Sequence, residues 1–218
     1  MAQTNIDFWE KILKNPTGKY LDLLTQEKKY IRNHIEKSQS VLDIGCGDGR
    51  NLLSLTDITE NITGLDIDEK AVSDAKENLK NHPRIKIVLG TGSDLPFPDT
   101  VFDRVVLSMT LVNLGDKKLQ TLSEMKRVLK PNGQIILSVY SEKSLPYRLE
   151  MYKLINLPVK EVSENRVTFD ESVGSNTSEQ FSVADIKLLV ESVGLSVNDH
   201  EEVEGIAHLF TLKQEILG

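Results

Sequence analysis

Short apolar runs alternate along this chain with segments whose apolar residues recur at helical spacing. The runs that predict strands are 41–44, 62–67, 85–89, 102–108 and 134–139. The stretches between them that predict helices, each with an apolar face, lie around 52–55, 71–79 and 119–129. Strands that alternate with helices of this length favour crossover connections and a mostly parallel sheet with helices on both faces. The fold class expected is therefore α/β.

The flanking regions follow other patterns. The start of the chain predicts two helices, over 7–14 and 20–37, and the end predicts two strands, over 195–203 and 206–212. Ser182 and Asp185 suit a capping box before another helix, which Gly194 ends.

The alternation of strands and helices stops after residue 140. Residues 145–155 have helical spacing, and 159–169 predict a hairpin that turns at Glu164 and Asn165. We expect a single domain over 1–218. It would have an N-terminal helical cap at about 1–37 and a lid-like insertion at about 141–180.

The composition of the chain argues against several classes of binding partner. The chain has 33 acidic and 26 basic residues, a net charge of −7, and no long basic run, which argues against bulk nucleic-acid binding. It has no long apolar window and no leader pattern at its start, so we expect a cytoplasmic protein without a membrane partner. Cys46 is the single cysteine and the four histidines are scattered, so no disulfide and no metal site are expected.

Glycines gather where the first predicted strand ends. Gly45, Gly47 and Gly49 follow Asp43 at every second position, a spacing that allows a tight turn and a close approach to a ligand. A dinucleotide fingerprint would need a third glycine at the position of Arg50. The pattern D-x-G-x-G-x-G instead resembles motif I of the class I S-adenosylmethionine (SAM) dependent methyltransferases, of the type that acts on small molecules.

The second predicted strand ends in an acid that fits this resemblance. Asp66 lies about twenty residues after the first glycine, where a carboxylate can accept hydrogen bonds from both ribose hydroxyls. Ile67 would then lie against the adenine face.

Residues 90–99, G-T-G-S-D-L-P-F-P-D, are similar to the adenine loop of the family. Thr91 stands where the family has an acid, so either Thr91 or Asp94 would contact the adenine amino group. We expect backbone groups of Gly92 and Ser93 to meet the edge of the ring.

Three further residues have alternative roles. Asp43 either holds the glycine loop through backbone N–H groups or approaches the ammonium of the methionine part of SAM. Tyr20 either closes over the carboxylate end of SAM, as N-terminal helices of this family often do, or packs as a surface tyrosine. Cys46 is interpreted as a small residue that passes close to the ligand.

The resemblance implies a Rossmann-like seven-stranded sheet of order 3-2-1-4-5-7-6, with the seventh strand antiparallel. It also implies SAM as cofactor, S-adenosylhomocysteine as product and methyl transfer by in-line displacement. The residues expected to bind the cofactor are Asp43, Gly45, Cys46, Gly47, Gly49, Asp66, Ile67, Gly92, Ser93, Ser108 and Tyr20.

The acceptor is less well defined. Residues 108–114 lack both the paired histidines common in the family and the N/D/S-P-P-Y/F/W motif of enzymes that methylate base amino groups. We therefore expect a small-molecule acceptor, or less readily a protein side chain. Asn113 could contact it or cap the next helix. The candidate acceptor-side residues are Met109, Thr110, Asn113, Tyr147, Arg148 and His208.

No residue is identified as the catalytic base, and two other functions remain open. One is a non-catalytic SAM-binding protein that regulates a partner. The other is an oxidoreductase that uses NAD, which Arg50 and the adenine loop disfavour.

Overall fold

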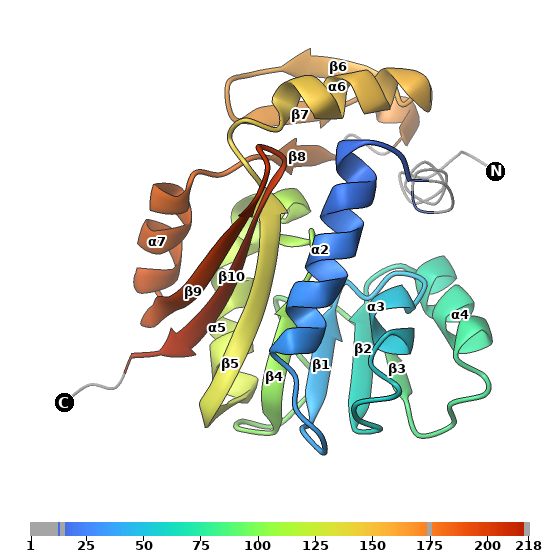
Figure 1. Ribbon diagram of the computed structural model, residues 1–218, viewed down its shortest axis with the longest axis vertical. Coiled ribbons are helices and arrows are strands. Elements are labelled where there is room, and N and C mark those ends of the chain that lie inside the picture. The colour runs from blue at the N-terminus through green and yellow to red at the C-terminus, as the bar shows by residue number, and fades with distance from the viewer. Residues whose placement is uncertain (1–12, 14–15, 174–175, 216–218) are drawn as a thin grey trace.

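The computed structural model describes residues 13, 16–173 and 176–215. A seven-stranded sheet lies at its centre (Figure 1), in the order β3-β2-β1-β4-β5-β10-β9. Strand β10 runs antiparallel to both its neighbours, and the other adjacent pairs are parallel. The predicted α/β fold class and strand order are confirmed, with β9 and β10 as the sixth and seventh strands.

The central strands are buried on both faces, as their continuous apolar runs predict: every residue of β1 and β2 is buried. The strands of the sheet are β1 (Val41–Ile44), β2 (Ile62–Asp66), β3 (Lys86–Leu89), β4 (Phe102–Leu107), β5 (Leu129–Tyr140), β9 (Leu195–Val203) and β10 (Ala207–Gln214).

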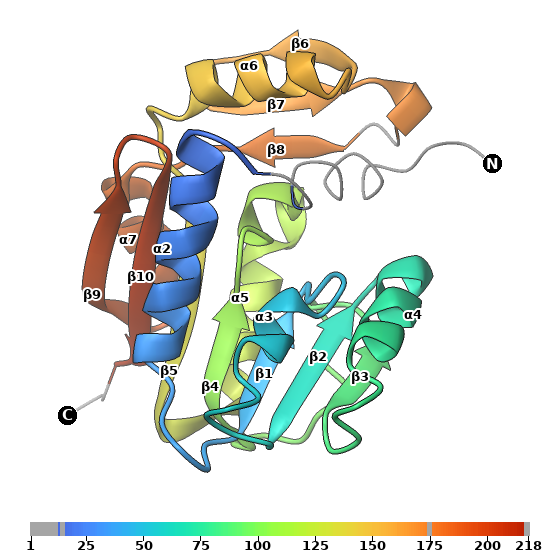
Figure 2. The same ribbon diagram turned by 45° about the vertical axis from the view of Figure 1, so that its right-hand side comes forward.

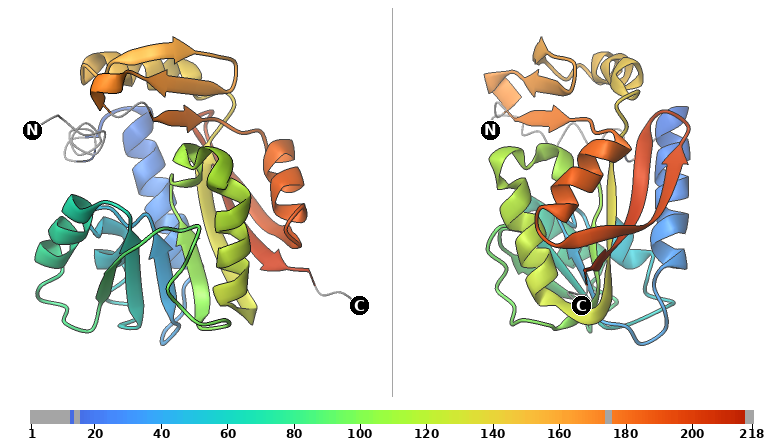
Figure 3. Two further views of the ribbon diagram at one scale, coloured as in Figure 1. Left: turned by 180° about the vertical axis from the view of Figure 1, so that it is seen from behind. Right: turned by 90° about the vertical axis from the view of Figure 1, so that its left-hand side faces the viewer.

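Helices cover both faces of this sheet. Helix α2 crosses one face, while α5 and α7 lie on the other (Figures 1 and 3). The helices are α2 (Lys19–Asn33), α3 (Arg50–Leu53), α4 (Glu69–Asn78), α5 (Lys118–Val128), α6 (Leu145–Leu154) and α7 (Val183–Glu191). No helix in these described residues is both long enough and apolar enough to span a membrane.

The segment after β5 forms a layer of its own above the carboxyl ends of the parallel strands (Figure 2). Helix α6 lies there with an antiparallel sheet of β6 (Val159–Val162), β7 (Arg166–Phe169) and β8 (Thr177–Glu179). The helix and the hairpin were predicted, whereas β8 was not. Tyr152 of α6 and Phe169 of β7 join the two parts, edge to face, with ring centroids 5.2 Å apart.

Local capping follows the sequence signals. The Asp68 side chain accepts a hydrogen bond from the backbone of Ala71 at the start of α4. Ser182 and Asp185 form the expected capping box at the start of α7.

The largest differences from the prediction are two element boundaries and one apolar face. Helix α2 ends at Asn33 instead of residue 37. Strand β5 begins at Leu129 instead of residue 134, because Pro131 disfavours helical backbone at the residue before it and Leu129 already has an extended ψ of 133°. In α3, Leu52 is buried but Leu53 is 45% exposed, so the apolar face is narrower than expected. The helix predicted over 7–14 lies outside the described residues apart from Leu13.

Candidate functional site

Two adjoining cavities lie at the carboxyl ends of the parallel strands. The β2 cavity, of about 520 Å³, is lined by residues that follow β2 and β3. The α2 cavity, of about 570 Å³, lies between α2 and the residues that follow β4. Gly45, Gly47, Arg50 and Thr110 line both, so the glycine loop forms the boundary between them. The carboxyl edge of such a sheet is where ligands bind in open α/β folds.

The glycine loop needs its glycines for different reasons. At Gly45, φ is +72° and a Cβ would come within 2.3 Å of Thr110 Oγ1, so a side chain would close the junction of the cavities. At Gly49, φ is +80° and a Cβ would come within 2.8 Å of Leu79. Gly49 therefore turns the chain into α3 and lets α4 pack closely, and it lines neither cavity.

Asp66 lies at the floor of the β2 cavity. Its Oδ2 accepts a hydrogen bond from Gly47 N at 2.9 Å, and its Oδ1 accepts one from Asp68 N at 3.0 Å. These bonds fix the carboxylate and leave a lone pair on each oxygen for a ligand hydroxyl. Ile67, beside it, is 74% exposed, although it is a large aliphatic residue on the cavity wall.

The predicted adenine loop forms another wall of the β2 cavity. At Gly92 a Cβ would come within 2.9 Å of Ile44, so backbone alone is accommodated there. Thr91 and Ser93 line the cavity with their hydroxyl oxygens 3.1 Å apart, and Asp94 does not line it. Of the two side chains considered for the adenine amino group, only Thr91 therefore lines this cavity.

Asp43 is buried beneath the loop without a partner. Both carboxylate oxygens are shielded from solvent, and neither has a hydrogen bond in the part of the chain that the structure describes. The loop-holding bond to Gly47 N comes from Asp66 instead. Burial raises the pKa of Asp43 well above its usual range, and the carboxylates of Glu27 and Asp66 raise it further.

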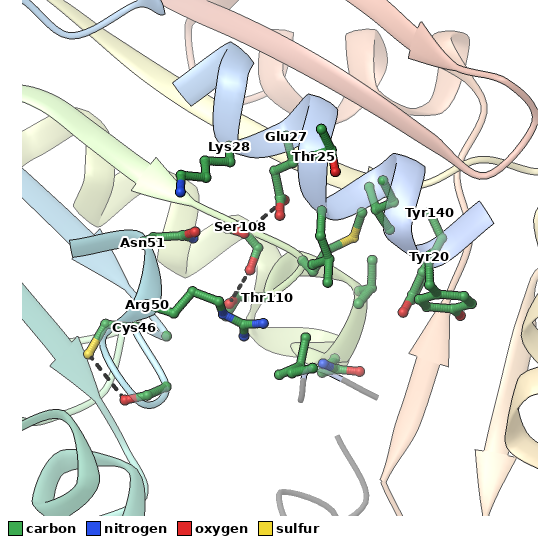
Figure 4. A pocket seen from close by; sticks show the side chains of 18 residues that line it. Tyr20, Thr25, Glu27, Lys28, Cys46, Arg50, Asn51, Ser108, Thr110 and Tyr140 are labelled. Atoms are coloured by element: carbon green, nitrogen blue, oxygen red, sulfur yellow. Dashed lines mark hydrogen bonds between the residues drawn. The ribbon is translucent and has the colours of Figure 1, made fainter. Parts of the chain in front are cut away.

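Glu27 enters the α2 cavity from α2 and is 4% exposed (Figure 4). Its Oε1 accepts hydrogen bonds from Ser108 Oγ, at 2.8 Å, and from Ser138 Oγ. Burial raises the pKa of Glu27, and the two hydroxyl groups lower it in part. Sequence reasoning missed this residue. The available signal was a glutamate on the apolar face of α2, in line with Tyr20, Leu23 and other buried residues of the helix.

The other walls of the α2 cavity are mainly apolar or aromatic. Tyr20 of α2 and Tyr140 of β5 face each other edge to face, with ring centroids 6.4 Å apart. Cys46 is a buried free thiol on the wall, and burial raises its pKa. The sequence-predicted residues after β4 that line this cavity are Ser108, Met109, Thr110 and Asn113.

Three acceptor-side candidates line neither cavity. Arg148, in α6, is fully buried against β8, and His208 is buried in β10. Tyr147 is 39% exposed and lies near Lys19. His208 Nε2 lies 2.9 Å from a carboxylate oxygen of the exposed Glu142, and its Nδ1 lies 3.0 Å from His200 Nε2, so both ring nitrogens have partners within the protein. Across the described residues, no group of histidine, cysteine and acidic side chains could hold a metal ion.

A model of the methyltransferase domain family matches residues 42–137, a stretch that holds the glycine loop, Asp66 and the adenine loop. A demethylmenaquinone methyltransferase of Staphylococcus aureus is 35% identical over 123 residues, which are 55% of this chain and 51% of that protein. The chain thus spans about half the length of the curated relatives that it matches.

Solved structures share the fold over most of the chain. The PH0226 protein of Pyrococcus horikoshii has a TM-score of 0.74 at 22% identity, with 92% of this chain and 93% of that chain covered. A 1,6-didemethyltoxoflavin-N1-methyltransferase of Burkholderia thailandensis, solved with bound 1,6-didemethyltoxoflavin and S-adenosylhomocysteine, has a TM-score of 0.68 at 15% identity. The match covers 88% of this chain and 77% of that one.

Proposed function

We propose that this chain binds SAM and methylates a small-molecule acceptor, because residues 42–137 match a methyltransferase domain and a demethylmenaquinone methyltransferase is 35% identical over 123 residues. The observation that carries the proposal is the pair of cavities that meet at Gly45 and Thr110. One has the groups that a nucleoside needs, the other is mainly apolar, and a methyl group could pass between them at the boundary.

The β2 cavity suits the adenosine part of SAM. Asp66 would accept hydrogen bonds from the ribose hydroxyls, and Ile67 would cover one face of adenine, which explains the exposure of a large aliphatic side chain. Backbone and hydroxyl groups of Gly92 and Ser93 would meet the edge of the ring. Asp43, beneath the glycine loop, is a buried acid without a hydrogen-bond partner in the described chain, and SAM carries positive charge at its sulfonium and ammonium groups.

The α2 cavity suits the acceptor. Its volume of about 570 Å³ is in the range of small-molecule sites, and Leu23, Leu24, Met109 and Val112 contribute apolar walls. The named relative acts on demethylmenaquinone and the named structural neighbour on 1,6-didemethyltoxoflavin, both of them small molecules. This agreement supports a small-molecule acceptor over a protein side chain.

Methyl transfer requires little covalent chemistry from the protein. The bond from sulfur to methyl carbon breaks as the acceptor atom attacks from the opposite side, and SAM becomes S-adenosylhomocysteine. Alignment of the acceptor and exclusion of water would provide most of the acceleration.

Two measurements test the proposal. In calorimetry, SAM and S-adenosylhomocysteine should bind directly and more tightly than NAD, and tighter binding of NAD would overturn the assignment. The protein is then incubated with methyl-labelled SAM and an extract of small metabolites, and labelled products are identified by mass spectrometry. Binding without any labelled product, together with capture of a stoichiometric protein partner, would favour the non-catalytic alternative.

A further inference from the structure

We propose that Glu27 is the catalytic base: it accepts the proton that the methyl acceptor loses on transfer. The acceptor atom is then an oxygen or nitrogen that carries hydrogen, on a mainly apolar small molecule. This inference rests on the proposed function and names the substrate class of the same site.

The geometry fixes one oxygen of Glu27 and leaves the other available. Ser108, directly after β4, and Ser138, in β5, both donate to Oε1. No described residue donates a hydrogen bond to Oε2, and Glu27 lines the α2 cavity. One residue of β5 and one residue just after β4 therefore hold the carboxylate in one orientation, and Figure 4 shows it extending from α2 toward Ser108.

The position of Glu27 is also the right one for proton transfer. Gly45 and Thr110, at the boundary of the two cavities, line the same α2 cavity as Glu27. An acceptor whose reactive atom points toward that boundary would lie between the methyl group and the carboxylate. Among the described residues that line this cavity, Glu27 is the only one with a carboxyl group.

Burial, and not the surrounding charges, favours proton uptake by Glu27. No described lysine or arginine forms an ion pair with Glu27, and burial raises the pKa of its carboxyl. The charged and titratable groups around it are Lys28 on its own helix, Asp43 on β1, Arg50 on α3 and Tyr140 on β5. Arg50 acts against the shift, and bound SAM would add positive charge that favours the ionised form.

The step balances without a further reactant. The acceptor O–H or N–H bond breaks, its proton goes to Glu27 Oε2, and the electron pair of the acceptor atom forms the new bond to the methyl carbon. The electron pair of the broken sulfur–carbon bond stays on sulfur, which leaves neutral S-adenosylhomocysteine. The proton leaves Glu27 for water after product release.

The test uses Glu27→Gln, which keeps the size of the side chain and an oxygen for Ser108 and Ser138. Asp22→Asn, an exposed position on the same helix, is the matched control. Label transfer from SAM into the metabolite extract is followed over a range of pH, and affinity for S-adenosylhomocysteine is measured by calorimetry. The labelled product is analysed for the atom that carries the methyl group.

We expect Glu27→Gln to slow transfer by about 10²- to 10⁴-fold, the usual contribution of a general base, with affinity for S-adenosylhomocysteine within about threefold of wild type. The rate of the variant should also lose the rise with pH that ionisation of the carboxyl gives the wild type. Asp22→Asn should behave as wild type, and the product should be methylated on oxygen or nitrogen.

Other outcomes overturn the inference in distinguishable ways. Wild-type transfer by Glu27→Gln removes the base, and a product methylated on carbon or sulfur overturns the oxygen or nitrogen acceptor; both outcomes leave the proposed function intact. A loss of affinity for S-adenosylhomocysteine as large as the loss of rate assigns Glu27 to cofactor binding. Absence of transfer by the wild type overturns both proposals.

Discussion

At the scale of single residues, three acids around the glycine loop differ in the hydrogen bonds that they accept. Asp66 accepts two backbone hydrogen bonds at the cavity floor, Glu27 accepts two from serine hydroxyls, and Asp43 accepts none in the described chain. Two are therefore oriented toward open space that a ligand can fill. The third is a buried group whose hydrogen-bonding capacity the described protein does not satisfy.

Asp66→Ala should weaken binding of S-adenosylhomocysteine by roughly tenfold or more. It removes two charge-assisted hydrogen bonds to ribose, each of about 1.5–3 kcal/mol, of which water recovers a part. Calorimetry measures the change, and circular dichroism checks the fold, since Gly47 N also loses a partner. Glu69→Ala, an exposed acid at the start of α4, should bind as wild type. An unchanged affinity for Asp66→Ala would reject the ribose role.

The sequence predicted the residues that line the β2 cavity better than those that line the α2 cavity. The glycine loop and Asp66 are defined by short spacings, which local backbone geometry enforces. Glu27 and Arg148 are defined by contacts with residues far along the chain, such as Ser138 for the one and Ser178 for the other. A charged residue on an apolar helix face predicts that such a partner exists, but not which one.

At the scale of elements, Arg148 connects α6 to β8 and β5. Its guanidinium donates to Ser178 O, at 3.0 Å, and to Gln180 Oε1, at 2.5 Å, and its centre lies 4.3 Å from the ring of Tyr140. Tyr140 lines the α2 cavity, so this contact joins the upper layer to the cavity wall. Arg148 was a candidate for contact with the acceptor, but its guanidinium is directed to these protein groups.

Arg148→Met should loosen the upper layer and leave cofactor binding unchanged. The substitution leaves the buried acceptors at Ser178 and Gln180 without their donor, at a cost of about 1–3 kcal/mol for each. Hydrogen exchange followed by mass spectrometry should show faster exchange over 145–180, with the affinity for S-adenosylhomocysteine retained. Arg166→Met, an exposed position on β7, is the control and should exchange as wild type. Equal protection in the two variants would mean that Arg148 does not hold this layer.

We expect residues 141–180 to be a lid that positions the acceptor. Replacement of 144–178 by a short Gly/Ser linker should keep S-adenosylhomocysteine affinity within severalfold, because Asp66 and the glycine loop lie elsewhere. Methyl transfer should collapse because the acceptor is no longer aligned. Both are measured on one preparation, by calorimetry and by label transfer. Unfolding of the shortened chain would show that the segment is structural.

The sequence predicted best those elements whose ends are defined by residues close together in the chain. The caps at Asp68 and Ser182 are formed by residues three positions away, so the sequence contains both partners. Strand β8 has three residues and exists only because β7 pairs with it. Such a strand has no periodicity of its own to detect.

At the scale of the whole molecule, the buried acids reduce stability near neutral pH. A carboxyl whose folded pKa is raised contributes stability that is fully present below its unfolded pKa, near 4, and is lost as pH rises through the folded pKa. Asp43 and Glu27 both have raised pKa values. His200 opposes them, because burial lowers its pKa, so a comparison with a variant is needed to isolate one group.

Asp43→Asn should raise the Tm of the ligand-free protein at pH 8, by about 2–4 °C for each kcal/mol gained. The amide is less costly to bury than the carboxylate. The difference in Tm from wild type should shrink as pH falls toward 4, where wild-type Asp43 is neutral as well. Thermal denaturation at several pH values measures it, and Asp22→Asn should show no such trend. A difference that does not vary with pH would mean that Asp43 does not ionise over this range.

The hydrogen bond from Tyr30 to Asp199, at 2.9 Å, joins α2 to β9 across 169 residues of chain. During synthesis α2 leaves the ribosome early and β9 leaves it almost at the end. The helix that carries Glu27 therefore cannot pack against β9 until nearly the whole chain has been made. The glycine loop and β2 need no such delay, since they are near neighbours in the sequence. Assembly during synthesis would thus form the floor of the β2 cavity first, and the two adjoining cavities would become continuous only when the last strands dock.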